Sequence, residues 1–324
     1  MQMNRSELWK NFRLGEELDV SGTFIYNGLR RFHELRKLDC SADLFEVFYQ
    51  ISIGIERLMK IAIVLLEHDD ASDQEAFEKS LSTHNHQALL ARIQKRADLK
   101  LSNSDNAFFH LLTRFYENLR YDRFSLSSPL ALGKEKHELF DFLEVQLKAE
   151  FGERNSIFGH ENTDQYKKFI RKIVVKIASS LYDVIEMRTR FLGLYTYELR
   201  HTSKAETVFL GKADLPTEDI LWKELLVFFM NTKETSSYLN FIRGIEPLEF
   251  DPGLVPDYLD CFQSDSTRAQ VVDELEVLYE DVPNKGDRLR MISVIGSPNV
   301  YFPEGDDEEE FEDELNPFDE PPSK

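Results

Sequence analysis

The chain has 324 residues, of which 42% are hydrophobic and 30% charged, and its formal net charge is −20. This length suggests one large domain or two ordinary ones, with a sizeable core. Non-specific nucleic-acid binding relies on Lys and Arg, so an acidic chain could hold RNA only in a local basic pocket. Cys40 and Cys261 lie far apart, which makes a disulfide framework or a cysteine-based zinc site implausible and is typical of a reducing cytoplasm.

The two ends of the chain carry different signals. The first twenty residues contain no apolar signal segment, and the longest apolar run, residues 61–66, is too short to cross a bilayer. We therefore expect a cytoplasmic protein without a membrane partner. From Glu304 onward eleven acids face one base, Lys324. Residues 304–324 should form a disordered acidic tail, because such a segment cannot bury enough apolar surface to fold.

Residues 1–204 read as helices. Apolar residues at helical spacing predict long helices over 44–62 and 163–185, with Ser41 or Asp43 as a cap for the first and Asn162 or Thr163 for the second. Shorter helices are predicted over 23–38, 84–97, 104–124 and 135–151, with a break in the "SLSSPLALGK" stretch. This pattern favours an antiparallel helical bundle and an all-α fold class.

Residues 205–303 have shorter apolar patterns and more Pro and Gly than the preceding part. They predict a smaller, mainly helical C-terminal module. "AETVFLG", residues 205–211, has the pattern of a short strand, whereas 218–231 and 267–279 have the spacing of helices. Pro and Gly recur over 246–257, which indicates loops.

The segment "ERNSIFGH", residues 153–160, brings together side chains suited to phosphate chemistry. On a continuous helix Arg154 and His160 would lie on different faces, but Gly159 and the following cap signals predict a break that could bring them to one point. Histidine can move a proton near neutral pH, arginine offers a fork of donors to phosphate oxygens, and Asn155 can hold either by hydrogen bonding. These three residues are candidates for metal-independent RNA cleavage; the alternative is a solvated, charged loop.

The order Arg154-Asn155-x4-His160 ahead of a long helix resembles the HEPN superfamily. "IGIERLMKIAIVLLE" and "THNHQALLARI" are similar to HEPN helices, so the resemblance covers roughly residues 20–195. It implies a homodimer in which Arg154 and His160 of two protomers form a composite cleft. It also implies RNA cleavage to a 2′,3′-cyclic phosphate without metal or cofactor, in a toxin or in anti-phage defence. Asn162 stands where HEPN toxins often carry an AMP-accepting tyrosine, which puts that mode of control in doubt.

Two further stretches carry candidate residues. Arg120, Tyr121 and Arg123 could form a substrate-binding rim that contacts phosphate and stacks on bases, or could be the end of a helix where arginines face its dipole. "His84-Asn85-His86" invites a metal interpretation, but His-x-His needs further ligands, so we favour the start of a helix.

A second function competes with the ribonuclease. The acidic body lacks a Gly-rich phosphate loop, G-x-S-x-G and H-E-x-x-H, which favours a non-catalytic HEPN-like scaffold that binds protein. The acidic tail could be a solubilising extension, recruit a basic protein partner, or cover a basic cleft as an inhibitor would.

Overall fold

The computed structural model describes residues 3–71, 73–122, 124, 126, 133–154, 156–194, 199–298, 300 and 302. Their regular elements are all helices, and the one β-type pairing among them is an isolated bridge between Lys37 and Glu161. The predicted all-α class is therefore confirmed. Most of the predicted break at 125–134 and the acidic tail 304–324 lie outside the described residues.

The chain divides into two compact units, an N-terminal unit (Met1–Leu221) and a C-terminal unit (Trp222–Lys324). The elements of the N-terminal unit are α1 (Arg5–Leu8), a π-helical turn (Trp9–Arg13), α2 (Leu14–Glu34), α3 (Ser41–Glu67), α4 (Gln74–Ser80), α5 (His86–Gln94), α6 (Asn103–Arg114), a second π-helical turn η2 (Phe115–Leu119), α7 (Arg120–Asp122), α8 (Lys134–Leu147), α9 (Asp164–Leu192), α10 (Lys204–Phe209) and the start of α11 (Leu215–Asn231). In the described part of the chain, no helix is both long and apolar enough to cross a membrane.

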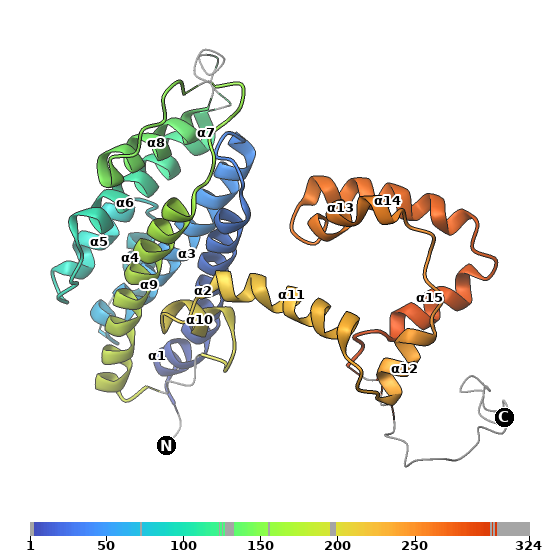
Figure 1. Ribbon diagram of the computed structural model, residues 1–324. Helices are drawn as coiled ribbons and strands as arrows, with labels where there is room; N and C mark the ends of the chain where they lie inside the picture. Colours follow the sequence, from blue (N-terminus) through green and yellow to red (C-terminus); the bar gives the residue numbers. More distant parts are fainter. Residues whose placement is uncertain are drawn as a thin grey trace. The chain divides into compact units, whose positions relative to one another are not determined.

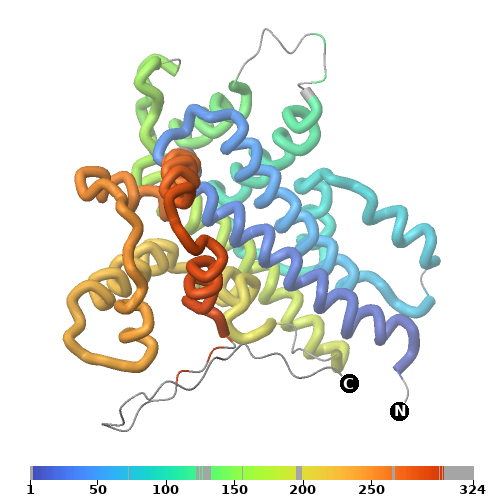
Figure 2. The backbone as a smooth tube through the Cα atoms, turned by 90° about the vertical axis from the view of Figure 1, so that its right-hand side faces the viewer, coloured from blue at the N-terminus to red at the C-terminus, as the bar shows by residue number. Residues whose placement is uncertain are grey.

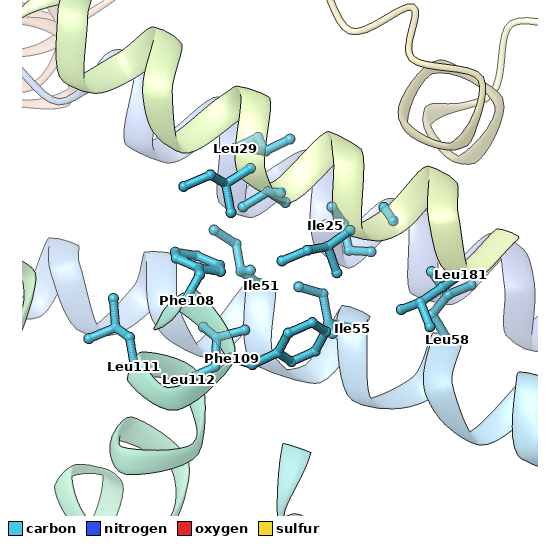
Figure 3. Close-up of a cluster of buried hydrophobic side chains, with 14 of the residues drawn as sticks. Ile25, Leu29, Ile51, Ile55, Leu58, Phe108, Phe109, Leu111, Leu112 and Leu181 are labelled. Carbon is cyan, nitrogen blue, oxygen red and sulfur yellow. The ribbon is translucent and has the colours of Figure 1, made fainter. Parts of the chain in front are cut away.

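The N-terminal unit is a helical bundle with α3 at its centre. Helix α3 packs against α2, α9, α5, α6 and α8 (Figures 1 and 2). Most of its apolar side chains are buried, and a narrower stripe that includes Glu46, Arg57 and Lys60 is only partly covered. Figure 3 shows the centre of this core, where Ile51 and Ile55 of α3 meet Ile25 of α2, Phe109 of α6 and their neighbours.

Glycine brings α2 and α3 unusually close together. A Cβ atom on Gly54 of α3 would lie 2.5 Å from Ile25 Cγ1 of α2, and one on Gly28 would lie 2.6 Å from Ile51 Cγ1. The Ser21 hydroxyl donates to the Gly54 carbonyl at 2.7 Å across the same contact. Only glycine permits this approach, which fixes how the two helices lie and hence where the connection between them, residues 35–40, is held.

The predicted capping residue is confirmed for one long helix, α9, and is wrong for the other, α3. Thr163 caps α9 through a hydrogen bond from the Tyr166 amide, as predicted. Helix α3 starts after Cys40 without a side-chain cap, so the predicted caps Ser41 and Asp43 are wrong. The Asp43 carboxylate instead accepts a hydrogen bond from Arg31 of α2 at 2.6 Å, because α2 lies close enough to compete for it.

The strand predicted at 205–211 is wrong, because residues 204–209 form α10. Ser203 caps this helix, and its apolar residues are buried against α2 and α9. Five apolar or small residues in a row fit a short buried helix as well as a strand, so the pattern alone could not separate them. Since α10 packs into the bundle, the boundary between units lies after Leu221 rather than at the 204/205 position expected from composition.

The C-terminal unit contains the remainder of α11 and several shorter helices. They are α12 (Ser237–Gly244), the 3-10 turn η4 (Pro252–Leu254), α13 (Val255–Asp260), α14 (Asp265–Glu280) and α15 (Lys285–Val294). None of its described residues is buried. Its contacts are local, such as the ring contact of Trp222 with Phe262 and the packing of α13 on α14.

Candidate functional site

The described residues of the segment 148–163, between α8 and α9, are not helical, in agreement with the break that Gly159 predicts. Gly159 has a φ of +70°, a left-handed conformation that L side chains rarely adopt. A Cβ atom there would also lie 2.8 Å from Asp39 Oδ2. The break predicted from the sequence is thus confirmed, and it turns the chain toward the α2–α3 connection.

Residues 158–162 pair with the α2–α3 connection through the backbone. The Leu38 amide donates to the His160 carbonyl and the Asn162 amide donates to the Arg36 carbonyl, both at 2.8 Å. Lys37 Nζ donates to the Phe158 carbonyl at 2.7 Å. Two loops that are far apart in the sequence therefore form a short antiparallel ladder at one end of the bundle.

Asn162 is a structural residue in this ladder. It is buried, and its Nδ2 donates to the Phe32 and Leu35 carbonyls, at 2.8 and 3.1 Å. These are carbonyls at the end of α2, which lack helical partners of their own. Asn162 therefore caps the C-terminus of α2, whereas the sequence suggested it as a cap for the start of α9.

His160 is buried, and both of its ring nitrogens are engaged. Nδ1 lies 2.9 Å from Asp39 Oδ1, while Nε2 lies 3.0 Å from the Phe151 carbonyl and 3.1 Å from that of Glu153. Carbonyl oxygens only accept, so Nε2 must carry a proton, and Nδ1 must carry one to donate to the carboxylate. The ring also packs edge-on against Phe140 at 4.8 Å between centroids.

Asp39 is the carboxylate that contacts the His160 ring. Partial burial tends to raise the pKa of the Asp39 carboxyl, but hydrogen bonds from the His160 ring and backbone amide, together with Lys136, hold it below its usual range. Lys136 of α8 lies 3.4 Å from Asp39 Oδ1 and donates to the Arg154 carbonyl at 2.6 Å. Asp39, His160 and Lys136 form a charged cluster, which we call the loop latch, that ties three segments together.

The Arg154 guanidinium pairs with carboxylates of α8 and not with the loop latch. Its Nη2 pairs with Asp141 at 2.6 Å and Glu144 at 2.8 Å, both on α8, and its side chain is 31% exposed. The hydrogen bond to Asp141 raises the pKa of the guanidinium above its ordinary value, against a smaller opposing effect of burial. No contact among the described residues joins the side chains of Arg154 and His160, and Asn155 lies outside the described residues.

The residues predicted as a substrate-binding rim lie at the end of the α6–η2–α7 segment. The Arg120 guanidinium lies 4.9 Å from the centre of the Tyr121 ring, and Tyr121 is 60% exposed. Arg123 lies outside the described residues. No hydrogen bond, ion pair or ring contact of the described residues connects Arg120 or Tyr121 with Arg154 or His160.

The prediction that His84-Asn85-His86 starts a helix is confirmed. The Asn85 side chain accepts a hydrogen bond from the Ala88 amide and caps α5, which begins at His86. His86 is buried with its Nε2 against the Ser52 carbonyl, and burial lowers its pKa, so its ring is neutral. Within the described ranges no three His, Cys, Asp or Glu side chains are placed to hold a metal ion.

A hollow of about 930 Å³ lies apart from all of these residues. It is lined by the start of the chain and by the segment after α3, including Trp9, Phe12 and His68. None of the residues predicted as functional from the sequence lines it.

No family model, curated protein or solved structure matches this chain. The HEPN resemblance therefore remains a prediction that rests on the sequence segments named above.

Sequence reasoning missed two residues of the loop latch. Asp39 contacts the His160 ring, and Lys136 contacts Asp39. Asp39 lies 121 positions before His160, and Lys136 is one of several charged residues at the start of α8. A single aspartate in a connection carries no periodic or motif signal. Only the pairing of the two loops reveals that it faces the histidine.

Proposed function

We propose that this chain is a non-catalytic helical interaction protein, in which the N-terminal unit is a rigid scaffold and the C-terminal unit binds a basic protein partner. The observation that carries this proposal is the unburied apolar surface of the C-terminal unit. Its exposed large apolar side chains include Leu225, Val227, Phe228, Phe229, Met230, Phe262, Val272, Val277, Leu289, Met291 and Ile295. Exposed apolar surface on this scale marks protein interaction sites.

Charge supports a basic partner. Residues 222–324 contain 25 acids and eight bases, a net charge of −17, whereas residues 1–221 carry a net charge of only −3. Complementary charge steers association and selects partners, while the apolar side chains contribute most of the binding free energy. A partner that presents a basic rim around an apolar face fits this combination.

The loop latch supports a structural role for the 153–160 segment. General acid–base catalysis needs a ring nitrogen that can reach the substrate, and both nitrogens of His160 are held by Asp39 and by backbone carbonyls. Phosphate binding by Arg154 would require it to leave two carboxylates on α8. Both features favour the scaffold over the ribonuclease.

A photo-crosslinking experiment tests the proposal. We expect p-benzoylphenylalanine at Phe229 or at Val277 to crosslink one and the same basic protein in cells, and raised salt to weaken that capture. The matched control is Val145 of α8, which is 76% exposed but lies in the N-terminal unit. Equal products at Val145, or none at the other two positions, would count against the proposal. A product of twice the chain mass would show a second copy instead.

The HEPN-type endoribonuclease, its homodimer and a toxin or anti-phage role remain predictions. The direct test is RNA cleavage in EDTA by the wild type and by Arg154→Ala. Arg154 is a suitable position because its exposed ion pairs contribute little to stability, so lost activity would be chemical in origin. Cleavage by the wild type that Arg154→Ala abolishes would restore the enzyme prediction and refute a purely non-catalytic role.

A further inference from the structure

A hollow of about 500 Å³ lies in the C-terminal unit. It is lined by the loop 246–249, by the end of α14, by the turn 281–284 and by the start of α15. Ligand sites in proteins usually have volumes of about 300–1,000 Å³. The hollow is therefore large enough to receive large side chains of a bound peptide.

Hydrogen bonds hold the elements around this hollow together. Arg288 of α15 donates from Nη1 to the Glu246 carbonyl at 2.8 Å. Just after the loop, the Asp251 amide donates to the Tyr258 hydroxyl at 3.0 Å, and this hydroxyl donates to Glu274 of α14 at 2.7 Å. The loop is thus tied to α15 directly and to α14 through Tyr258 of α13.

The charge of the hollow is negative. Its lining includes four acids and one base: Glu246, Glu249, Asp281, Asp287 and Arg288. Asp287 pairs with Arg290, but no hydrogen bond or ion pair of the described residues engages the carboxylates of the other three acids. Even with Arg288, a net negative charge is left, which favours a cationic occupant.

The end of α14 adds to this negative potential. A helix C-terminus carries a partial negative charge, which basic side chains usually offset. The last turn of α14 has no basic residue, and the helix ends in Glu280 with Asp281 after it. Lys285 lies over the Tyr279 ring, 5.5 Å from its centre, and pairs with neither acid among the described residues. The positive end of α15 is already offset by Asp287 in its first turn. A cationic group beside Asp281 would therefore relieve the repulsion at the end of α14.

The remaining lining favours a peptide over a metal ion. Leu248, Leu278 and Met291 line the hollow, and Met291 is 41% exposed. No three His, Cys, Asp or Glu side chains are placed to hold a metal ion in the part of the chain that the structure describes, so the acids do not converge on one point. Separate positive groups with a large apolar side chain between them match such a lining.

We infer that this hollow binds a segment of a basic protein in which Lys or Arg residues flank large apolar side chains. An apolar side chain of the segment packs against Leu278 and Met291, and the neighbouring cationic groups pair with Glu246 and Asp281. The inference rests on the proposed function, because it names the surface and the peptide chemistry by which the C-terminal unit recognises its basic partner.

Fluorescence anisotropy with the full chain tests the inference. The probe is a labelled peptide in which arginine and leucine alternate, and two matched probes carry glutamate in place of arginine or serine in place of leucine. We expect saturable binding of the first probe only. The double variant Glu246→Gln, Asp281→Asn should weaken it about fivefold or more, because two charge pairs at the edge of an apolar contact are lost.

Two control variants separate the hollow from the unit as a whole. Asp273→Asn with Glu276→Gln also removes two negative charges, from exposed positions of α14 outside the hollow, and should bind within about twofold of the wild type because salt screens distant charges. Met291→Ser should weaken binding several-fold, whereas Val272→Ser, at a residue that is 43% exposed and does not line the hollow, should not.

Absence of saturable binding of the arginine–leucine peptide, equal binding of the glutamate peptide, or equal weakening by the hollow and control variants would overturn the inference. Crosslinking at Phe229 and Val277, neither of which lines the hollow, then decides about the proposed function separately. Capture of one basic protein that Glu246→Gln, Asp281→Asn does not reduce would show that the partner binds elsewhere on the C-terminal unit. Absence of capture by the wild type would refute the proposed function itself.

Discussion

Replacing His160 by alanine should destabilise the N-terminal unit much more than replacing Arg154 by alanine. The first change removes the ring donors to Asp39 and to the Phe151 and Glu153 carbonyls, together with a ring packed on aromatic neighbours. The backbone amide at position 160 and Lys136 still donate to Asp39. A buried polar group left without a partner costs about 1–3 kcal/mol. Because the Asp39 side chain is 26% exposed and can be partly solvated, we expect a total loss of about 3 kcal/mol.

The Arg154→Ala change removes only ion pairs between partly exposed side chains. Such pairs contribute about 0–1 kcal/mol each in most proteins. The two substitutions lie on one segment and both delete a side chain that contacts a carboxylate, so Arg154→Ala is a matched control for His160→Ala. A structural latch predicts unequal stability, whereas a pair of catalytic residues predicts similar, small effects on stability.

Thermal unfolding followed by circular dichroism at 222 nm measures both variants. For a unit of this size, 3 kcal/mol corresponds to a fall in melting temperature of about 6–12 °C, against about 0–8 °C for the loss of two ion pairs in the control. A His160→Ala protein that melts within about 2 °C of the wild type would show that the loop latch does not hold the fold, and would refute the structural interpretation of His160.

Three further outcomes are expected from the same structure. Gly159→Ala should destabilise by more than Gly193→Ala, because both have a positive φ but only the first would place a Cβ against Asp39; melting temperatures compare the two. The pKa of Asp39 is lowered in the folded protein, so its contribution to the free energy of unfolding is present above the unfolded pKa of aspartate and is lost as pH falls through the folded pKa. In Asp39→Asn, the free energy of unfolding should therefore fall less steeply on acidification, as measured by denaturant unfolding at several pH values. Gly22→Ala should destabilise by about 2 kcal/mol or more, because its Cβ would lie 2.4 Å from α10, while Gly244→Ala meets no atom and should stay within about 1 kcal/mol of the wild type.

The fold class and the long helices could be predicted because their signals are local and periodic. The apolar spacing over 44–62 predicts the central helix α3, and Thr163 marks the start of α9. The strand at 205–211 was wrong because its burial comes from α2 and α9, which no local pattern contains. The caps of α3 were wrong for the same reason, since Arg31 of a neighbouring helix takes Asp43.

The candidate site could be located only in part. Gly159 correctly predicted a break, because a left-handed position is a property of one residue. The sequence could not predict where the two side chains lie once the helix is broken. That depends on Asp141 and Asp39, which reach Arg154 and His160 from α8 and from the α2–α3 connection.

The contrast between His160 and His84 shows why residue types alone do not identify a catalytic or binding histidine. Both rings are held at Nδ1 by a carboxylate, Asp39 in one case and Glu56 in the other. His160 also contacts two carbonyls at Nε2 and is buried, so its ring ties the loops together. His84 has no described partner at Nε2, and its side chain is 55% exposed. A spacing motif selects the first histidine, whereas the second becomes a candidate only when the far nitrogen and the surrounding charges are taken into account.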